Sequence, residues 1–362
     1  MTKERDLEKW EQYAKDGLKV LRRNEEEITL ELQGNTPSKD VVALTTSLGR
    51  TRLSVTTHKI KEDDSRLIDL YGLSKYTLRP EGYEFPKKTH PFIPSKISNY
   101  VDGGEGYLEQ LARALHLFKQ AALIGPRGTG KTHIVYALGE AMGLPIWEIN
   151  CGLQTSSGDL FGAFVGLGKE NWVDGQIVSW AKNGGILYLD EANKMKADIA
   201  ARLNPILDDR EHLVLMEMDG EVIKRHPLGY MVLSINPLTQ EFVAAKPLND
   251  ALRRRMGAWL NFDYLSVSPN VSEKEVHLIM EKGDVDEAMA ERIVQVAAEL
   301  RLRYKNGDLP YGPSVRDLSN WSQLIADGSS PHEAARQTIV ALTSDETDVQ
   351  DEVMKIIGRV FD

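Results

Sequence analysis

The feature that most constrains the fold is a glycine-rich stretch between an apolar run and a helical pattern. It reads Gly-Pro-Arg-Gly-Thr-Gly-Lys-Thr over residues 125–132. The apolar run 121–124 precedes it, and a run with helical periodicity extends from Lys131 to Met142. Glycines let backbone N–H groups approach a phosphate at a helix N-terminus, where the helix dipole favours negative charge. This strand–loop–helix context predicts a P-loop that binds a nucleoside triphosphate.

The loop residues have separate expected roles. Lys131 is expected to reach the β- and γ-phosphates, and the Thr132 hydroxyl to bind Mg²⁺. ATP and Mg²⁺ are therefore the predicted cofactors. The predicted nucleotide-binding residues are Gly125, Pro126, Arg127, Gly128, Thr129, Gly130, Lys131 and Thr132.

Composition excludes several classes of protein. The 362 residues are 41% hydrophobic and 27% charged, as in an ordinary soluble protein of two or three domains. A formal net charge of −10 gives no global electrostatic case for wrapping a nucleic acid. The single cysteine, Cys151, excludes an internal disulfide framework. Because no apolar run approaches about 18 residues and the first residues are charged, we expect a cytoplasmic protein.

Residues 1–95 are predicted to form a small N-terminal α+β domain. Apolar residues at helical spacing predict an amphipathic helix from residue 2 to about residue 27, and short alternating runs predict strands after it. Four prolines between residues 80 and 94 indicate a linker, which places the first boundary near Ser95. The helical spacing involves Leu7, Trp10, Ala14, Leu18 and Leu21, and the predicted strands are 28–32, 41–44 and 52–57.

Residues 96–265 are predicted to form an α/β domain, because short apolar strands alternate with helices. This alternation favours a parallel sheet covered on both faces, with ligands at the carboxyl ends of its strands. Residues 266–362 show no strand pattern and predict a helical lid domain. A capping box is expected at residues 272–275, and Ser330 with Pro331 is expected to begin another helix. The predicted strands are 121–124, 145–150, 185–189, 230–235 and 259–262.

Polar side chains follow two of these strands. The strand 185–189 ends in Asp190 and Glu191. A carboxylate at a strand tip can hold Mg²⁺ through water, and the next one can act as general base toward the attacking water. We assign Asp190 the first role and Glu191 the second. The strand 230–235 ends in Asn236, a neutral amide that is expected to lie between these positions and to sense the γ-phosphate.

Arginines provide candidate partners for the transferred phosphoryl group. Three of them, residues 253–255, precede the last strand, and one such arginine can reach a neighbouring subunit as a finger. Arg316 lies near the start of a predicted helix, against the usual preference for anions there. A bound phosphate or a carboxylate partner would each explain that position.

The order of these motifs resembles that of the AAA+ ATPases. Residues 150–236 are similar to the MoxR branch, and within it to the CbbQ/NorQ and gas-vesicle GvpN type of dynein-related AAA proteins. The resemblance covers about residues 97–325, and the first 95 residues carry none of the motifs of this family. The segments that carry the detailed likeness are 157–162, 174–176, 184–193, 203–207 and 225–227.

The resemblance implies a Mg·ATP site between neighbouring subunits of a homo-oligomeric ring, usually a hexamer. It implies that Lys131 and Thr132 form Walker A, and that Asp190 and Glu191 form Walker B. Asn236 would be sensor 1 and Arg316 sensor 2. In the family, the arginine finger usually comes directly before a phenylalanine, and here Met256 takes the place of that phenylalanine. Arg255 is therefore the first candidate for the arginine finger, and Arg254 is the second.

Two inserts are candidates for the surfaces through which such an ATPase contacts its client. Alternating runs flank Asp219-Gly220, a two-residue hairpin signal. Residues 161–172 carry glycines and aromatics and resemble the insert of the family within its second helix. In a ring, both would face the pore or a partner. The aromatics could equally anchor these loops to the core.

We therefore expect a chaperone-like remodelling motor that acts on a protein client, with a von Willebrand factor A domain protein as a partner in trans. One alternative is a nucleic-acid-linked motor or defence NTPase resembling McrB, working with a separate effector. Another is a scaffold that binds nucleotide but barely hydrolyses it, which Glu191 disfavours. Asn193 lies beside Walker B without the aspartate of a guanine-recognition motif, so GTP is not favoured.

Overall fold

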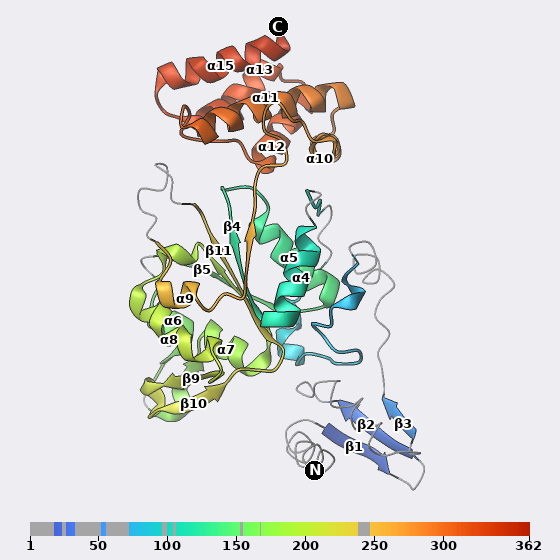
Figure 1. Ribbon diagram of the computed structural model, residues 1–362, viewed down its shortest axis with the longest axis vertical. Helices are drawn as coiled ribbons and strands as arrows, with labels where there is room; N and C mark the ends of the chain where they lie inside the picture. Colours follow the sequence, from blue (N-terminus) through green and yellow to red (C-terminus); the bar gives the residue numbers. More distant parts are fainter. Residues whose placement is uncertain are drawn as a thin grey trace.

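A computed structural model gives the architecture of the chain. It describes residues 18–23, 27–32, 52–55, 72–95, 100–103, 106–152, 155–166, 168–237 and 247–362. Figure 1 shows three parts along the long axis: N-terminal strands, a central α/β body and C-terminal helices. The predicted strand 41–44 and the first part of the predicted N-terminal helix lie outside the described residues.

A five-stranded parallel sheet forms the centre of the α/β body. Its strand order is β12-β4-β11-β8-β5, and each neighbouring pair is parallel. The fold is thus α/β with a parallel sheet, as the alternation of strands and helices predicts. The strands are β4 (Gln120–Ile124), β5 (Ile146–Asn150), β8 (Gly185–Asp190), β11 (Gly229–Ile235) and β12 (Ala258–Asn261).

Helices cover both faces of this sheet (Figure 1). Alternate side chains of β8 enter two separate cores, because successive residues of a strand point to opposite faces. Ile186 and Tyr188 pack with α4 and α5, whereas Leu187 and Leu189 pack with the helices of the other face. The helices are α4 (Tyr107–Phe118), α5 (Lys131–Met142), α6 (Ser157–Phe161), α7 (Gln176–Asn183), α8 (Ala197–Leu207) and α9 (Asp250–Arg253).

The N-terminal part differs from the helix predicted there. Residues Leu18–Arg23 form strand β1, which pairs antiparallel with β2 (Glu27–Leu32). β2 in turn pairs parallel with β3 (Arg52–Val55). The prediction of a helix through Leu18 and Leu21 is therefore wrong, because backbone pairing with β2 overrides the local spacing of apolar residues. The predicted strands at 28–32 and 52–57 are present, the second in shortened form.

Residues 72–95 are not a free linker. Four of their side chains, Leu73, Leu78, Tyr83 and Phe85, are buried in the same core cluster as α4 and α5. The Tyr230 hydroxyl of β11 donates to the Leu78 carbonyl at 2.7 Å. The prolines therefore shape a segment that packs against the α/β body. We propose that the domain boundary expected near Ser95 lies before Gly72.

The C-terminal part is helical, and it is built around Trp321 and Leu318, both fully buried. Residues 267–362, all described, form no strand apart from one isolated bridge between Val267 and Asn270. Ser330 caps its helix as predicted. The helices are α10 (Glu273–Gly283), α11 (Glu287–Asn306), α12 (Val315–Ala326), α13 (Pro331–Ala335), α14 (Ala341–Thr343) and α15 (Thr347–Phe361).

The capping box predicted at Ser272 does not form. Ser272 is the N-cap of α10, but its side chain makes no capping hydrogen bond. The expected partner, Glu275, is fully buried and forms an ion pair with Arg301 at 2.8 Å. A buried carboxylate requires a strong partner, so the guanidinium of α11 takes precedence over the local cap.

The two predicted inserts are short antiparallel hairpins. The first pairs β6 (Gly162–Phe164) with β7 (Trp172–Asp174), and the second pairs β9 (His212–Leu215) with β10 (Glu221–Lys224). The second turn spans residues 216–220, because η5 (Met216–Met218) forms a helical turn before Asp219. The expected two-residue turn is thus wrong. An ion pair between Lys169 and Asp219 joins the two hairpins.

Candidate functional site

The carboxyl ends of three neighbouring strands bring the predicted site together. β11 lies between β4 and β8 in the sheet, with Ile235 opposite Ile124 and Leu233 opposite Leu189. The P-loop follows β4, Asp190 and Glu191 end β8, and Asn236 follows β11. Asn236 therefore lies between the P-loop and the two carboxylates, as the order of the motifs predicts.

Glycines of the P-loop are required by close contacts. A Cβ at Gly128, whose φ is +70°, would lie 2.1 Å from the Ser314 Cβ. A Cβ at Gly125 would lie 2.4 Å from the Phe262 carbonyl oxygen. Gly130 has a φ of +91° and is the N-cap of α5 without a side-chain cap. The first N–H groups of α5 can therefore meet an anion, as at other helix N-termini.

Lys131 turns back onto its own loop. Its ammonium donates to the carbonyls of Gly125 at 2.7 Å and Pro126 at 2.6 Å, and to Asn236 Oδ1 at 3.2 Å. Burial lowers the pKa of Lys131 to about 8, although Asp190 and Glu191 act in the opposite direction. A triphosphate beside this buried ammonium would favour its charged form.

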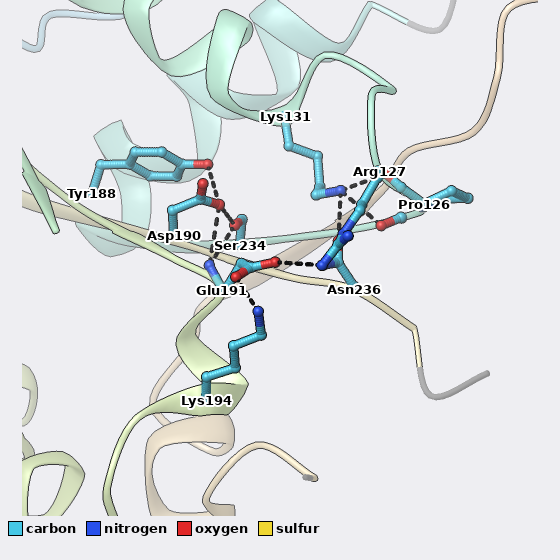
Figure 2. A network of polar contacts seen from close by, with 10 residues as sticks. Pro126, Arg127, Lys131, Tyr188, Asp190, Glu191, Lys194, Ser234 and Asn236 are labelled. Carbon is cyan, nitrogen blue, oxygen red and sulfur yellow. Dashed lines mark hydrogen bonds and ion pairs between the residues drawn. The ribbon is translucent and has the colours of Figure 1, made fainter. Parts of the chain in front are cut away.

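Glu191 is surrounded by donors (Figure 2). Its carboxylate accepts from Asn236 Nδ2 at 3.2 Å, from Arg127 Nη2 at 3.4 Å and from Lys194. The residue has a φ of +51°, an uncommon value for a side chain larger than glycine. The sharp turn after β8 thus aims Glu191 at the P-loop. Lys194 was not among the residues predicted for the site.

Asp190 is tied to the strands around it. Its Oδ1 accepts from the Tyr188 hydroxyl at 3.0 Å, from the Glu191 amide at 3.1 Å and from the Ser234 hydroxyl. The Tyr188 hydroxyl also lies 3.1 Å from Thr132 Oγ1. Sequence reasoning missed Tyr188 and Ser234. Tyr188 could have been found, because residues two apart on a strand share a face.

A cavity of about 1000 Å³ opens in front of these residues. The P-loop, Asp190, Glu191 and Asn236 line one side, and Ser314 to Asp317 of the C-terminal helices line another. Arg316 is exposed at the start of α12 and makes no hydrogen bond or ion pair with the residues that the structure describes. The fold therefore brings Arg316 to the same cavity as the P-loop. The volume of the cavity falls in the range of small-molecule sites.

The three arginines at residues 253–255 lie outside this cavity. None of them is among the described residues that line it. Arg255 donates to the Asn204 carbonyl at 3.2 Å and the Ala251 carbonyl at 2.9 Å, and pairs with Asp208 at 3.1 Å. Arg254 is exposed. A role for either arginine in phosphate chemistry thus requires a second subunit.

Thr132 and Asp190 suit Mg²⁺ by their chemistry, because Mg²⁺ prefers oxygen ligands and keeps several waters. Both oxygens lie within hydrogen-bonding distance of one hydroxyl, that of Tyr188. In the part of the chain that the structure describes, no group of three or more histidine, cysteine or acidic residues could hold a metal. The nucleotide phosphates would have to complete the coordination.

Comparison with known proteins gives the family. A model of the AAA domain (dynein-related subfamily) matches residues 120–256, and a model of the CbbQ/NirQ/NorQ C-terminal region matches residues 275–360. The denitrification regulatory protein NirQ of Pseudomonas aeruginosa is 32% identical over 251 residues, which cover 69% of this chain and 93% of NirQ. The chain belongs to the CbbQ/NirQ/NorQ family of AAA+ proteins. The family resemblance inferred from the motifs is confirmed.

Two further relatives and one solved structure match a comparable share of this chain. Protein CbbQ of Hydrogenophilus thermoluteolus is 30% identical and covers 70% of this chain and 94% of its own length. Protein NorQ of Paracoccus denitrificans is 28% identical and covers 66% and 85%. The solved structure of NtrX from Brucella abortus in complex with ATP reaches a TM-score of 0.43 at 16% identity, covering 82% of this chain and 63% of NtrX.

The family match indicates nucleotide binding, and the helices of the structure bear on whether the chain spans a membrane. The AAA+ P-loop family binds nucleotides, and its members are generally ATPases. Among the helices of the described residues, none combines the length and apolar character that a membrane span requires.

Proposed function

We propose that this protein hydrolyses ATP in the cavity between the P-loop and α12. The observation that carries the proposal is the position of the Asn236 amide. Its Oδ1 accepts from Lys131 at 3.2 Å, and its Nδ2 donates to Glu191 at 3.2 Å. One side chain thus joins the residue that would bind the phosphates to the one that would activate water.

In the proposed reaction, a water held by Glu191 and Asn236 attacks the γ-phosphorus. The water proton moves to the Glu191 carboxylate, and the bond between the γ-phosphorus and the bridging oxygen of ADP breaks. Lys131 exchanges its carbonyl partners for phosphate oxygens, and Arg316 reaches the γ-phosphate from α12. Positive groups at these positions stabilise the charge that develops on the transferred phosphoryl group.

Mg²⁺, held by Thr132 and through water by Asp190, would neutralise charge on the phosphate oxygens. This assignment agrees with the oxygen ligands that Mg²⁺ prefers.

We further propose that the protein works as a ring, a hexamer, in which an arginine from one subunit enters the site of its neighbour. Arg254 fits this role better than Arg255, because it is exposed whereas Arg255 is bound to α8 and to Ala251. The ring would act on a protein client, with a von Willebrand factor A domain protein as partner.

A nucleic-acid-linked motor resembling McrB is the alternative function. Binding of DNA by the purified protein that weakens as salt rises would favour this alternative, and no binding at low salt would count against it.

The proposal predicts that Glu191→Gln binds ATP but loses turnover. A general base contributes about 10²–10⁴-fold, so we expect at least a 100-fold lower rate of phosphate release. Purified wild type and variant are compared by ATP hydrolysis, by ATP affinity and by mass in solution with and without Mg·ATP. Glu273→Gln, an exposed glutamate of α10, is the matched control and should hydrolyse ATP as the wild type does.

ATP-dependent assembly into a species of ring mass would support the oligomer. Turnover that persists in Glu191→Gln would contradict the role of this carboxylate. Tight binding without wild-type turnover in any assembly would favour a nucleotide-gated scaffold.

A further inference from the structure

The hydroxyl of Tyr188 occupies an unusual position for a core tyrosine. The side chain is fully buried on β8 and packs with α4 and α5. Its hydroxyl lies 3.1 Å from Thr132 Oγ1 and 3.0 Å from Asp190 Oδ1, and Figure 2 shows it pointing toward Asp190. These two oxygens come from different elements, the first turn of α5 and the end of β8.

The direction of the hydrogen bonds follows from the number of protons. An ionised carboxylate only accepts, so the Tyr188 hydroxyl donates its single proton to Asp190 Oδ1. The contact between Thr132 and Tyr188 then requires the Thr132 hydroxyl to donate to the tyrosine oxygen. A chain of two hydrogen bonds thus runs from Thr132 through Tyr188 to Asp190. Thr132 Oγ1 keeps its lone pairs, because its proton is directed away from the cavity.

The other hydrogen-bond donors at Asp190 also leave oxygens of the site available to a metal. Besides Tyr188, the Ser234 hydroxyl and the Glu191 amide also donate to Oδ1. The structure gives Oδ2 no hydrogen bond from the described residues. One carboxylate oxygen is therefore used for orientation, and the other remains available to a metal-bound water.

We propose that Tyr188 is a positioning residue that aligns Thr132 and Asp190 for Mg²⁺ before nucleotide binds. This inference rests on the proposed Mg·ATP site. Mg²⁺ demands near-ideal octahedral geometry. Partners that orient ligands change metal affinity by about 10–100-fold when they are removed. Phenylalanine at this position would fill the same space and lack only the hydroxyl. A change in metal affinity on this substitution would therefore report the alignment that the hydroxyl provides.

The test compares Tyr188→Phe with Tyr230→Phe. Tyr230 is a matched control, because it is a buried tyrosine in the same core cluster and its hydroxyl donates to the Leu78 carbonyl. Full-length proteins are loaded with ADP, and Mn²⁺ binding is followed by electron paramagnetic resonance. ADP affinity without metal is measured in EDTA, and thermal melting checks the fold. Because no hydrolysis is involved, these readouts are independent of turnover.

We expect Tyr188→Phe to bind Mn²⁺ roughly 10-fold more weakly, with ADP affinity in EDTA and the melting curve close to those of the wild type. Tyr230→Phe should bind Mn²⁺ as the wild type does. The fold should survive, since Asp190 keeps the donors Ser234 and Glu191.

Unchanged Mn²⁺ affinity in Tyr188→Phe, with normal binding by the wild type, would overturn the proposal and leave the proposed function intact. An equal loss of ADP affinity in EDTA would also overturn it, because a distorted loop rather than metal alignment would then be at fault. A wild type whose ADP binding does not respond to Mn²⁺ would overturn both this inference and the proposed Mg·ATP site.

Discussion

At the scale of single residues, Arg254 and Arg255 differ in what holds them. Arg255 links α9 to the end of α8 through the Asn204 carbonyl and Asp208. We predict that Arg255→Ala lowers the free energy of unfolding by about 2 kcal/mol, since hydrogen bonds to charged groups contribute about 1.5–3 kcal/mol. Arg254→Ala should leave stability unchanged but lower ATP turnover by about 10³-fold or more, because an arginine finger contributes about 10³–10⁵ to kcat. Denaturant unfolding and phosphate release measure the two effects.

A mixing experiment separates a finger from a residue of the same subunit. In an assembly of Arg254→Ala with Glu191→Gln subunits, an intact catalytic glutamate can face an intact arginine from its neighbour. Turnover should then reappear although each variant alone is inactive. Failure of the mixture to recover, with assembly intact, would argue against a finger at Arg254.

At the scale of elements, His226 connects the sheet to the segment 72–95. Its Nδ1 accepts from the Leu228 amide at 3.1 Å, so Nε2 carries the proton and faces the Tyr83 hydroxyl at 3.2 Å. Burial, with a smaller contribution from Lys119, lowers the pKa of His226 to about 4. The imidazole is therefore neutral in the folded protein and takes up a proton more readily when the chain unfolds.

The sign of the pH dependence follows from this lowered pKa. The contribution of His226 is complete above pH 6.5, the ordinary histidine pKa, and is lost as pH falls toward 4. The loss amounts to about 3 kcal/mol of unfolding free energy. Denaturant unfolding between pH 7 and pH 4 measures it. His226→Gln should flatten this dependence, whereas His277→Gln, a change at an exposed histidine, should not. An equal slope in both variants would contradict the assignment.

At the scale of the whole molecule, Arg301 holds the C-terminal helices to the nucleotide side. It pairs with Glu275, donates to the Ser266 carbonyl at 3.1 Å and to the Pro313 carbonyl at 2.8 Å, and lies over the Tyr264 ring. These contacts join the chain that leaves β12 to the loop that begins α12. Arg301 thus fixes the position from which Ser314 and Arg316 face the P-loop.

We predict that Arg301→Met lowers the free energy of unfolding by about 3–5 kcal/mol, because it leaves the Glu275 carboxylate buried without its partner. The double variant with Glu275→Leu should recover most of this loss. Its ATP affinity should remain weaker, since the bonds to Ser266 and Pro313 are still missing. Thermal unfolding and ATP titration measure both quantities. Wild-type ATP affinity in the stable double variant would show that Arg301 is structural only.

The amino-acid sequence by itself determined the central sheet and most of the site. The P-loop, the carboxylate pair and Asn236 could be placed because each follows an apolar strand, and parallel strands end at one edge of a sheet. Neighbouring residues in the chain carry these signals. Strand, loop and helix patterns were therefore sufficient for Lys131, Asp190 and Glu191.

Only the tertiary structure decided the features whose partners are distant in the chain. Residues Leu18–Arg23 became a strand because β2 pairs with them, and residues 72–95 packed because α4 and α5 offer a core. Glu275 pairs with Arg301, 26 residues away, instead of taking part in the capping box at Ser272. The contact between the Tyr188 hydroxyl and Thr132, which lies 56 residues away in the chain, arose in the same way. Local spacing cannot show these contacts, because folding selects the partner that best satisfies a buried backbone or polar group.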